Sequence, residues 1–323
     1  MKSLLLKLLV VPLLALAAAP RAEAQAYPSK PMRMYVGYSA GGAVDIIARV
    51  LGQQISTSVG QPVIVENKPG ANTNIAMRAL MDSPADGYTL MLTANALAAN
   101  PTLYQPPPFD PARDVTLVSL VGRVPVVLAV NAQSDITTLA QLVATAKAKP
   151  GTITFGTPGN GSTPHLAVEL FERAAGITLT HVPYKGGSQA ITDTLSGQIQ
   201  VVAVNALEVL PQSKAGKLRV VAVMSPGRSP LFPDAPTIAE SGHPGFEAAV
   251  WYGVIGPANL PPAVVTRMHD EVQKALRTPE VRDRLTSAGG EVLPATREQF
   301  VSMVAAERAR YEKLIREAGI KPD

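Results

Sequence analysis

The chain has 323 residues, of which 46% are hydrophobic, 17% charged and 5% aromatic, and its formal net charge is +4. It contains no cysteine, which excludes disulfides, thiolate metal sites and cysteine nucleophiles. The basic residues are scattered rather than clustered, which excludes a nucleic-acid-binding surface.

The first 24 residues have the pattern of a secretory signal peptide. Lys2 and Lys7 form a positive start, and residues 8–19 are an almost unbroken apolar run. A run of about a dozen residues is shorter than the roughly 20 that a membrane-spanning helix needs. Small residues allow cleavage after Ala24 or after Ala26. Cleavage after Ala24 removes three bases and one acid, so the charge falls from +4 to +2. We therefore expect a soluble, periplasmic protein.

Short apolar strands alternate with helical patterns along most of the chain, which indicates an α/β fold with mainly parallel strands. The first strands are predicted at residues 32–38, 62–65 and 88–92. A helix follows the first of them and ends near Gly60, because apolar residues recur there with helical spacing. Residues 106–113 are rich in proline and are predicted to form a loop.

A second block of strands and helices begins near Val124. Its strands are predicted at residues 126–130, 152–155, 179–182, 201–204 and 218–223. Thr138 is expected to cap a helix with Gln141 three residues on, as in a capping box. Thr163 is predicted as the N-cap of another helix, with Pro164 in its first position. The buried face of this helix is expected to comprise Leu166, Leu170 and Phe171.

The C-terminal part is predicted to hold a strand at residues 250–255 and two helices, at 262–276 and 298–318. About 300 residues exceed what one hydrophobic core usually organises, so we expect two lobes.

The predicted division places residues 25–124 and 226–323 in lobe 1 and residues 125–225 in an inserted lobe 2. Two crossover strands, near residues 121–126 and 221–225, would join the lobes and form a hinge.

Several predicted strands end in small or hydroxyl residues and run directly into a helix. Ligands of open α/β sheets bind at this edge, and helix N-termini bind carboxylates through unpaired N–H groups and the positive end of the dipole. Glycine lets the backbone approach the ligand closely. The candidate ligand-binding residues are Tyr38, Ser39, Ala40, Gly41, Gly42, Asp45, Thr93, Ala94, Asn95, Thr157, Gly159, Asn160, Gly161, Ser162, Thr163, His165, Tyr184, Lys185, Gly186 and Asn205.

Some of these candidates have a structural interpretation as well. Asp45 lies in the first turn of a helix, where a carboxylate complements the helix dipole. His165 fits a role in orienting its loop, and Lys185 fits either an exposed lysine or a partner of a second ligand carboxylate. Asn205 fits pocket lining and turn formation equally. The other histidines, His181, His243 and His269, are scattered and are expected to be solvated or structural.

A hydrolase is an alternative suggested by Ser162 and His165, which are three residues apart. The chain lacks the Gly-x-Ser-x-Gly elbow of such enzymes, so we expect no catalytic activity. Residues 156–163 also lack the Gly-Lys-Ser/Thr of a P-loop. No His/Asp/Glu cluster has metal-ligand spacing, and no cofactor is expected. A second alternative is an extracytoplasmic sensor that partners a signalling kinase.

The chain resembles the extracytoplasmic solute receptors of tripartite tricarboxylate transporters, the Bug or TctC family. The resemblance covers essentially the whole chain after the signal peptide. It rests on the order and spacing of motifs at residues 27–31, 41–49, 65–71, 86–90, 159–167, 181–186, 215–219 and 233–237.

This resemblance implies a type II periplasmic-binding-protein fold, with two α/β lobes joined by two crossover strands. It places a ligand carboxylate between residues 38–42 and 93–95 of one lobe and residues 157–163 and 184–186 of the other. It also implies two membrane partners, a large and a small permease subunit. We expect a monomer that binds a small carboxylate and then closes about its hinge, as contacts with both lobes require.

The sequence departs from the family pattern at two places. Ser39-Ala40 precedes the paired glycines where relatives often have proline, and Val204 stands where relatives are often acidic. The missing acid disfavours an amino-bearing ligand and favours a di- or tricarboxylate or an aromatic acid.

Overall fold

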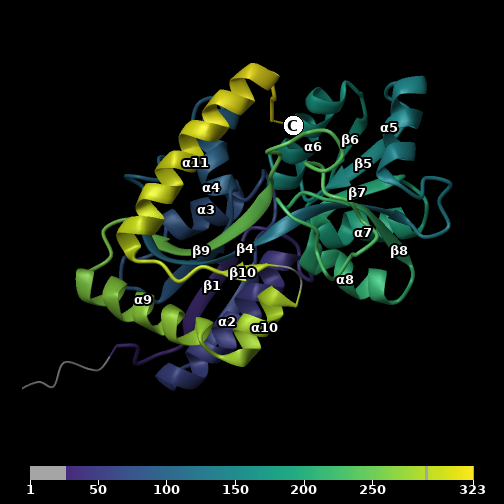
Figure 1. Ribbon diagram of the computed structural model, residues 1–323. Helices are drawn as coiled ribbons and strands as arrows, with labels where there is room; N and C mark the ends of the chain where they lie inside the picture. Colours follow the sequence, from purple (N-terminus) through teal and green to yellow (C-terminus); the bar gives the residue numbers. More distant parts are fainter. Residues whose placement is uncertain (1–26, 288–289, 323) are drawn as a thin grey trace, which may run out of the picture.

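The computed structural model describes residues 27–287 and 290–322. It consists of two α/β lobes that share one curled sheet (Figure 1). The predicted signal peptide lies outside the described residues. Within them, no helix combines the length and the apolar character needed to cross a membrane.

The first lobe begins with three parallel strands. β1 (Met32–Val36) lies between β2 (Val63–Asn67) and β3 (Thr89–Thr93). Helix α2 (Ala43–Val59) follows β1 and ends at Gly60, as predicted. Gly60 has a φ of 70°, and its N–H donates to the carbonyl of Ser56, the usual arrangement of a left-handed helix cap.

Two shorter helices complete this part of the first lobe. They are α3 (Asn74–Met81) and α4 (Ala96–Leu103). The residues predicted as a proline-rich loop, 106–113, form no helix or strand.

A single long strand, β4 (Val115–Asn131), runs through both lobes. Residues 115–125 pair with β9 (Ala249–Pro257) in the first lobe, and residues 126–131 pair with β7 and β8 in the second. The sequence predicted only residues 126–130 as a strand, because Gly122, Arg123 and Pro125 interrupt the apolar run. The interruption is tolerated because the register with β9 shifts there, between Leu120 and Gly122.

The prediction of mainly parallel strands is wrong for the sheet as a whole. Four pairings are parallel, but β4 is antiparallel to all its neighbours, and β3 is antiparallel to β9. The reason is that β9 lies beside both β3 and β4 and runs antiparallel to them. The sheet is therefore mixed, with parallel strands toward its two ends.

The second lobe repeats the parallel arrangement. β5 (Thr154–Thr157) lies between β6 (Thr180–Pro183) and β7 (Val201–Asn205), and β8 (Leu218–Val223) pairs with β4. Four helices pack around these strands. They are α5 (Leu139–Ala148), α6 (Thr163–Ala175), α7 (Gly187–Leu195) and α8 (Ala206–Lys214).

Two local predictions for α6 need correction. Its N-cap is Ser162, whereas Thr163 and Pro164 already belong to the helix. Leu166 and Phe171 are buried as predicted, but Leu170 is 37% exposed. It lies at the edge of the buried face, in the groove between α6 and the C-terminal helix.

The C-terminal part has one more helix than the two that were predicted. It comprises α9 (Pro262–Leu276), α10 (Pro279–Thr286), the short strand β10 (Glu291–Val292) and α11 (Arg297–Ala318). Sequence analysis missed α10, whose eight residues include four charged ones. Helix α11 lies along the first lobe, and the C-terminus beyond it approaches the second lobe (Figure 1). There, the side-chain amide of Asn160 donates to the carbonyl of Lys321 at 2.7 Å.

Three backbone segments lie side by side where the lobes meet. The N–H of Met224 donates to Val126, the N–H of Val126 to Ala248, and the N–H of Ala248 to Met224, at 2.8–3.1 Å. Between Met224 and Ala248 the chain returns to the end of β8, where the N–H of Ile238 donates to the carbonyl of Val223. The predicted lobe boundaries stay a prediction, but these three segments form the junction about which the lobes could rotate.

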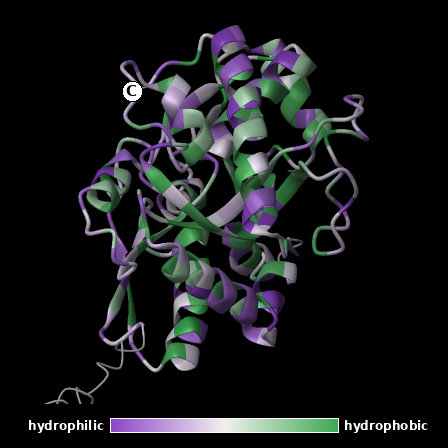
Figure 2. Cartoon of the chain, turned by 90° about the vertical axis from the view of Figure 1, so that its left-hand side faces the viewer, coloured by the Kyte–Doolittle hydropathy of each residue, from purple (hydrophilic) through white to green (hydrophobic). Residues whose placement is uncertain are grey.

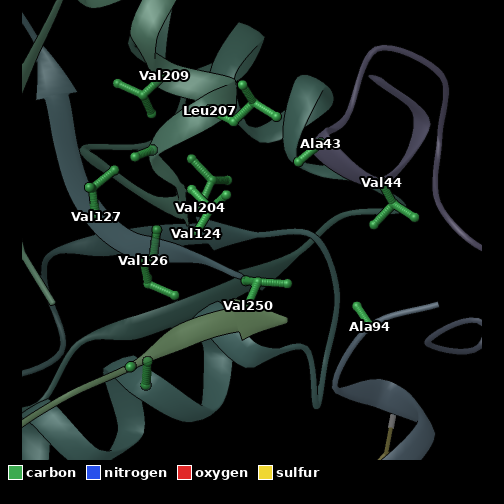
Figure 3. Close-up of a cluster of buried hydrophobic side chains, with 14 of the residues drawn as sticks. Ala43, Val44, Ala94, Val124, Val126, Val127, Val204, Leu207, Val209 and Val250 are labelled. Carbon is green, nitrogen blue, oxygen red and sulfur yellow. The ribbon is translucent and has the colours of Figure 1, made fainter. Parts of the chain in front are cut away.

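Apolar side chains from both lobes pack around this junction. Val124 and Val126 of β4 are fully buried between Val250 of the first lobe and Val204 of the second (Figure 3). Figure 2 shows the same pattern for the whole molecule, with hydrophobic strands in the interior and hydrophilic faces on the outer helices. The junction is therefore part of one continuous core.

Candidate functional site

A cavity of about 30 Å³ lies between the lobes, at the N-termini of α2, α6 and α7 and beside α8. It has room for about two water molecules, so a ligand of several heavy atoms can enter only when the lobes separate. The residues that line it are Tyr38, Gly42, Ala43, Val44, Ala94, Pro158, Ser162, Thr163, Pro164, Gly187, Asn205, Glu208 and Val250.

The turn before α2 is held by Asp45. Gly41 adopts a φ of 79°, and its N–H donates to Asp45 Oδ2 at 2.9 Å. Arg49 and Asn67 bind the same carboxylate at 2.8 and 2.9 Å. Burial by itself would raise the pKa of Asp45, but these partners hold it below its ordinary value. Asp45 does not line the cavity, so its position fits the structural interpretation.

The loop before α6 rests on a pair of stacked histidines. The rings of His165 and His181 lie 3.9 Å apart and are nearly parallel. His165 Nδ1 accepts the N–H of Gly161 at 3.0 Å, and His181 Nε2 lies 2.7 Å from the hydroxyl of Thr157. Burial, with a further contribution from His165, lowers the pKa of His181 to about 3. Of the two roles expected for His181, solvated or structural, the structural one fits, because β6 brings it against α6.

The geometry of His165 also bears on the hydrolase alternative. Its Nδ1 is occupied by the N–H of Gly161, and its Nε2 lies 3.5 Å from Glu169. Both ring nitrogens thus have partners other than Ser162. The imidazole is placed to orient the loop rather than to activate a hydroxyl.

The two lobes touch directly at the edges of the cavity. Across one edge, the N–H of Ser39 donates to the carbonyl of Lys185 at 3.1 Å, and the hydroxyl of Ser188 donates to the carbonyl of Ala40 at 3.2 Å. Across the other, a Cβ on Gly161 would lie 2.1 Å from Leu103. The structure is therefore a closed arrangement of the lobes.

Hydrogen bonds to Asn95 hold the segment that follows β3. Asn95 binds the hydroxyl of Tyr311 at 2.9 Å and accepts the N–H of Trp251 at 3.0 Å. These bonds leave Ala94, the residue before it, at the cavity wall. Tyr184, another candidate, bonds Asp193 of α7 at 2.7 Å and does not line the cavity.

Glu208 is the acidic cavity residue that was not among the predicted candidates. The other lining residues outside the candidate list are Ala43, Val44, Pro158, Pro164, Gly187 and Val250. Glu208 lies in the first turn of α8 and is only 9% exposed. The side-chain amide of Asn205, the N-cap of this helix, donates to its Oε1 at 2.8 Å. Burial raises the pKa of Glu208 to about 8, against the opposing effects of the Ala43 N–H and Asn205. An asparagine followed three residues later by glutamate is typical of helix caps, which is why it attracted no functional interpretation.

Six of the predicted site residues line the cavity: Tyr38, Gly42, Ala94, Ser162, Thr163 and Asn205. Ser39, Ala40, Gly161, Lys185 and Gly186 lie at the contacts between the lobes. The others do not line the cavity: Gly41, Asp45, Thr93, Asn95, Thr157, Gly159, Asn160, His165 and Tyr184. The part of the chain described by the structure contains no cluster of His, Asp and Glu side chains suited to a metal.

Several polar atoms around the cavity are buried without a hydrogen-bond partner. They are the hydroxyls of Ser162 and Tyr252, Asn205 Oδ1 and Glu208 Oε2. Buried polar atoms are almost always paired in folded proteins. A group of them beside a cavity between two lobes is typical of a ligand-binding site.

Two α/β lobes, a junction of crossing strands and a polar cavity at helix N-termini are the architecture of the periplasmic-binding-protein fold. The family model described as tripartite tricarboxylate transporter family receptor matches residues 47–320. The chain belongs to this family of solute-binding receptors and is not an enzyme.

Individual relatives agree with this assignment. The chain is 36% identical over 306 residues to protein BugT of Bordetella pertussis, covering 94% of each chain. It superposes on the periplasmic binding protein BugD with a TM-score of 0.88 and 30% identity, covering 92% of this chain and 100% of that one.

Two similar structures contain carboxylates. A protein of R. palustris solved with adipate is 33% identical, with a TM-score of 0.87 and coverage of 92% and 100%. The protein MatC from Rhodopseudomonas palustris, solved with bound malate, is 26% identical, with a TM-score of 0.84 and coverage of 90% and 100%.

Proposed function

We propose that this protein captures a small carboxylate in the periplasm and delivers it to the membrane permease subunits of a tripartite transporter. The observation that carries the proposal is the convergence of the N-termini of α2, α6 and α7 on one cavity between the lobes. A helix N-terminus carries N–H groups without helical partners and the positive end of the helix dipole, so three of them at one place favour an anion.

Binding is proposed to proceed by closure of the lobes. In the open form, the Gly41-Gly42 turn is exposed and the carboxylate docks at the start of α2 that follows it. The loop at residues 157–163 then closes over the ligand from the second lobe. Closure is stabilised only as far as the ligand contacts both lobes. The relatives solved with adipate and malate support a carboxylate as the ligand.

A thermal-shift screen tests this proposal. The chain from Gln25 onward is heated with mono-, di- and tricarboxylates, aromatic acids, amino acids and sugars. A ligand that binds only the folded state raises the melting temperature in proportion to RT ln(1 + [L]/Kd). We expect a carboxylate to do so in a concentration-dependent way. A shift with neutral or cationic compounds alone would refute the anion site.

Delivery to a permease is tested separately. The large and small permease subunits are expected to retain the receptor with its ligand and to release it without the ligand. A receptor that binds its carboxylate but is never retained would instead favour the sensor alternative.

A further inference from the structure

A groove on the second lobe is separate from the cavity between the lobes. It measures about 1360 Å³ and is bounded by α5, the end of α6, the edge of β8 and the segment at residues 228–243. It shares no lining residue with the cavity between the lobes. In Figure 1, α5 and β8 lie on the side of the second lobe that faces away from the first lobe. Binding of a solute between the lobes therefore does not account for this groove.

Arg219 of β8 lines the groove without a partner for its charge. Its Nη1 is buried and makes no hydrogen bond, and no carboxylate of the described residues forms an ion pair with it. Buried polar atoms are almost always paired in folded proteins, and a guanidinium pairs most strongly with a carboxylate. Arg219 therefore favours an acidic group that comes from another molecule.

The other charged side chains give the groove a positive balance. Lys147 is exposed and forms no ion pair or hydrogen bond with the described residues. Arg228 already binds Glu240 at 2.9 Å, and Asp234 is the one carboxylate among the described lining residues. Two uncommitted cations and one carboxylate thus line the groove, which favours an acidic partner.

The outer edge of β8 is free over most of its length. β8 pairs with β4 along one side. Along its other side the described part of the chain pairs only at Val223, through a bridge to Thr237. Residues 218–221, beyond this bridge, line the groove. An open strand edge offers unpaired N–H and C=O groups to another strand.

The size of the groove and its apolar side chains fit a segment of polypeptide better than a small molecule. Sites for small molecules usually measure about 300–1,000 Å³, less than this groove. Phe171, Leu231 and Phe232 contribute apolar lining. Peptides that add to a sheet edge place alternate side chains in pockets of this kind.

We infer that the groove binds an extended, acidic segment of a partner protein, which adds a strand to the outer edge of β8. Backbone hydrogen bonds to residues 218–221 hold the segment, and an aspartate or glutamate of the segment pairs with Arg219. The inference goes beyond the proposed function and does not depend on which solute binds between the lobes.

Selection from random seven-residue peptides displayed on phage tests the inference. The chain from Gln25 onward is the bait, and peptides that also bind the variant Arg219→Gln are removed. We expect the selected peptides to be rich in aspartate or glutamate. The best of them, made synthetically, should bind the wild type about tenfold or more tighter than Arg219→Gln. Its affinity should fall as the salt concentration rises from about 50 to about 300 mM.

Arg284→Gln is the matched control, because Arg284 is an exposed arginine of α10 outside the groove. It should bind the selected peptide as the wild type does. Both variants should melt cooperatively, which separates a loss of binding from a loss of folding.

Methylation of the peptide's backbone nitrogens separates strand addition from attraction by charge alone. In an added strand only alternate N–H groups point at the neighbouring edge. Methylating one alternate set should therefore weaken binding by about tenfold or more, and methylating the other set should change it little.

Equal binding of the peptide by the wild type and Arg219→Gln, or the same effect from both methylated sets, would overturn the inference. So would a selection that yields no acidic peptide. A groove that takes only a second copy of this chain, or only inorganic phosphate, would overturn it as well. None of these outcomes affects the proposed binding of a carboxylate between the lobes.

Discussion

At the scale of single residues, the site depends on side chains that hold loops rather than on side chains that react. Asp45 fixes the Gly41 turn, and His165 fixes the N–H of Gly161. Each bond satisfies a backbone donor at the start of a helix, where four N–H groups lack helical partners. These bonds hold the two loops whose next residues, Gly42 and Ser162, line the cavity.

The stacked histidines make stability depend on pH. The pKa of His181 is about 3 in the folded protein and about 6.5 when unfolded. Between these values the unfolded chain binds more protons, so stability is lost as the pH falls below about 6.5. We expect His181 by itself to contribute a loss on the order of 1–2 kcal/mol between about pH 7 and pH 5. The raised pKa values of Glu208 and Glu172 contribute in the opposite direction. Denaturant unfolding at several pH values measures this loss.

The variant His181→Gln provides the comparison. Glutamine can still bond the hydroxyl of Thr157 but does not titrate, so this part of the pH dependence should disappear. An identical pH profile in both proteins would show that His181 does not carry it.

At the scale of helices and strands, glycines determine whether the two loops can meet. Gly161 has a φ of 72°, and a Cβ there would lie 2.1 Å from Leu103 of the other lobe. Gly176 has a φ of 61° and open space around it. A substitution would therefore strain the backbone at both positions. Of the two, only Gly161 lies at the contact between the lobes.

We expect Gly161→Ala and Gly176→Ala to lose similar stability, about 1 kcal/mol each. Gly161→Ala should in addition weaken ligand binding by about tenfold or more, since its methyl group opposes closure. Calorimetry with the best carboxylate from the thermal screen measures the difference. Equal affinities in the two variants would place the binding loop elsewhere.

Much of this architecture could be predicted from the sequence. Strands such as β8 and helices such as α9 follow directly from apolar spacing and from turn residues. Strand β4 could not be predicted in full, because Gly122, Arg123 and Pro125 interrupt its apolar pattern. Its pairing partner, β9, also lies more than 120 residues away in the sequence. The mixed sheet has the same cause, since pairing direction depends on contacts between distant segments.

The candidate site was predictable to a similar extent. Strand ends followed by glycine and hydroxyl residues predicted loops from which six candidate residues border the cavity, and the role of these residues in binding stays a prediction. Glu208 could not be identified, because its local pattern is that of a helix cap and its burial depends on Gly42 and Gly187 from other elements. The contact between His165 and His181 likewise appears only when α6 and β6 pack together.

At the scale of the whole molecule, the proposed binding of a ligand requires the lobes to move about their junction. The closed cavity of about 30 Å³ is too small for a dicarboxylate or an amino acid. The continuous core around Val124 and Val126 joins the lobes, so binding must shift the population between open and closed forms without unfolding either lobe.

Energy transfer between dyes on the two lobes measures whether a ligand brings the lobes together. The chain has no cysteine, so Thr57→Cys on α2 and Thr145→Cys on α5, both exposed, provide unique labelling sites. We predict that a carboxylate ligand increases transfer to a single high value, with the same half-saturation as calorimetry, and that Gly161→Ala weakens this response. Saturable binding without any change in transfer would contradict the account.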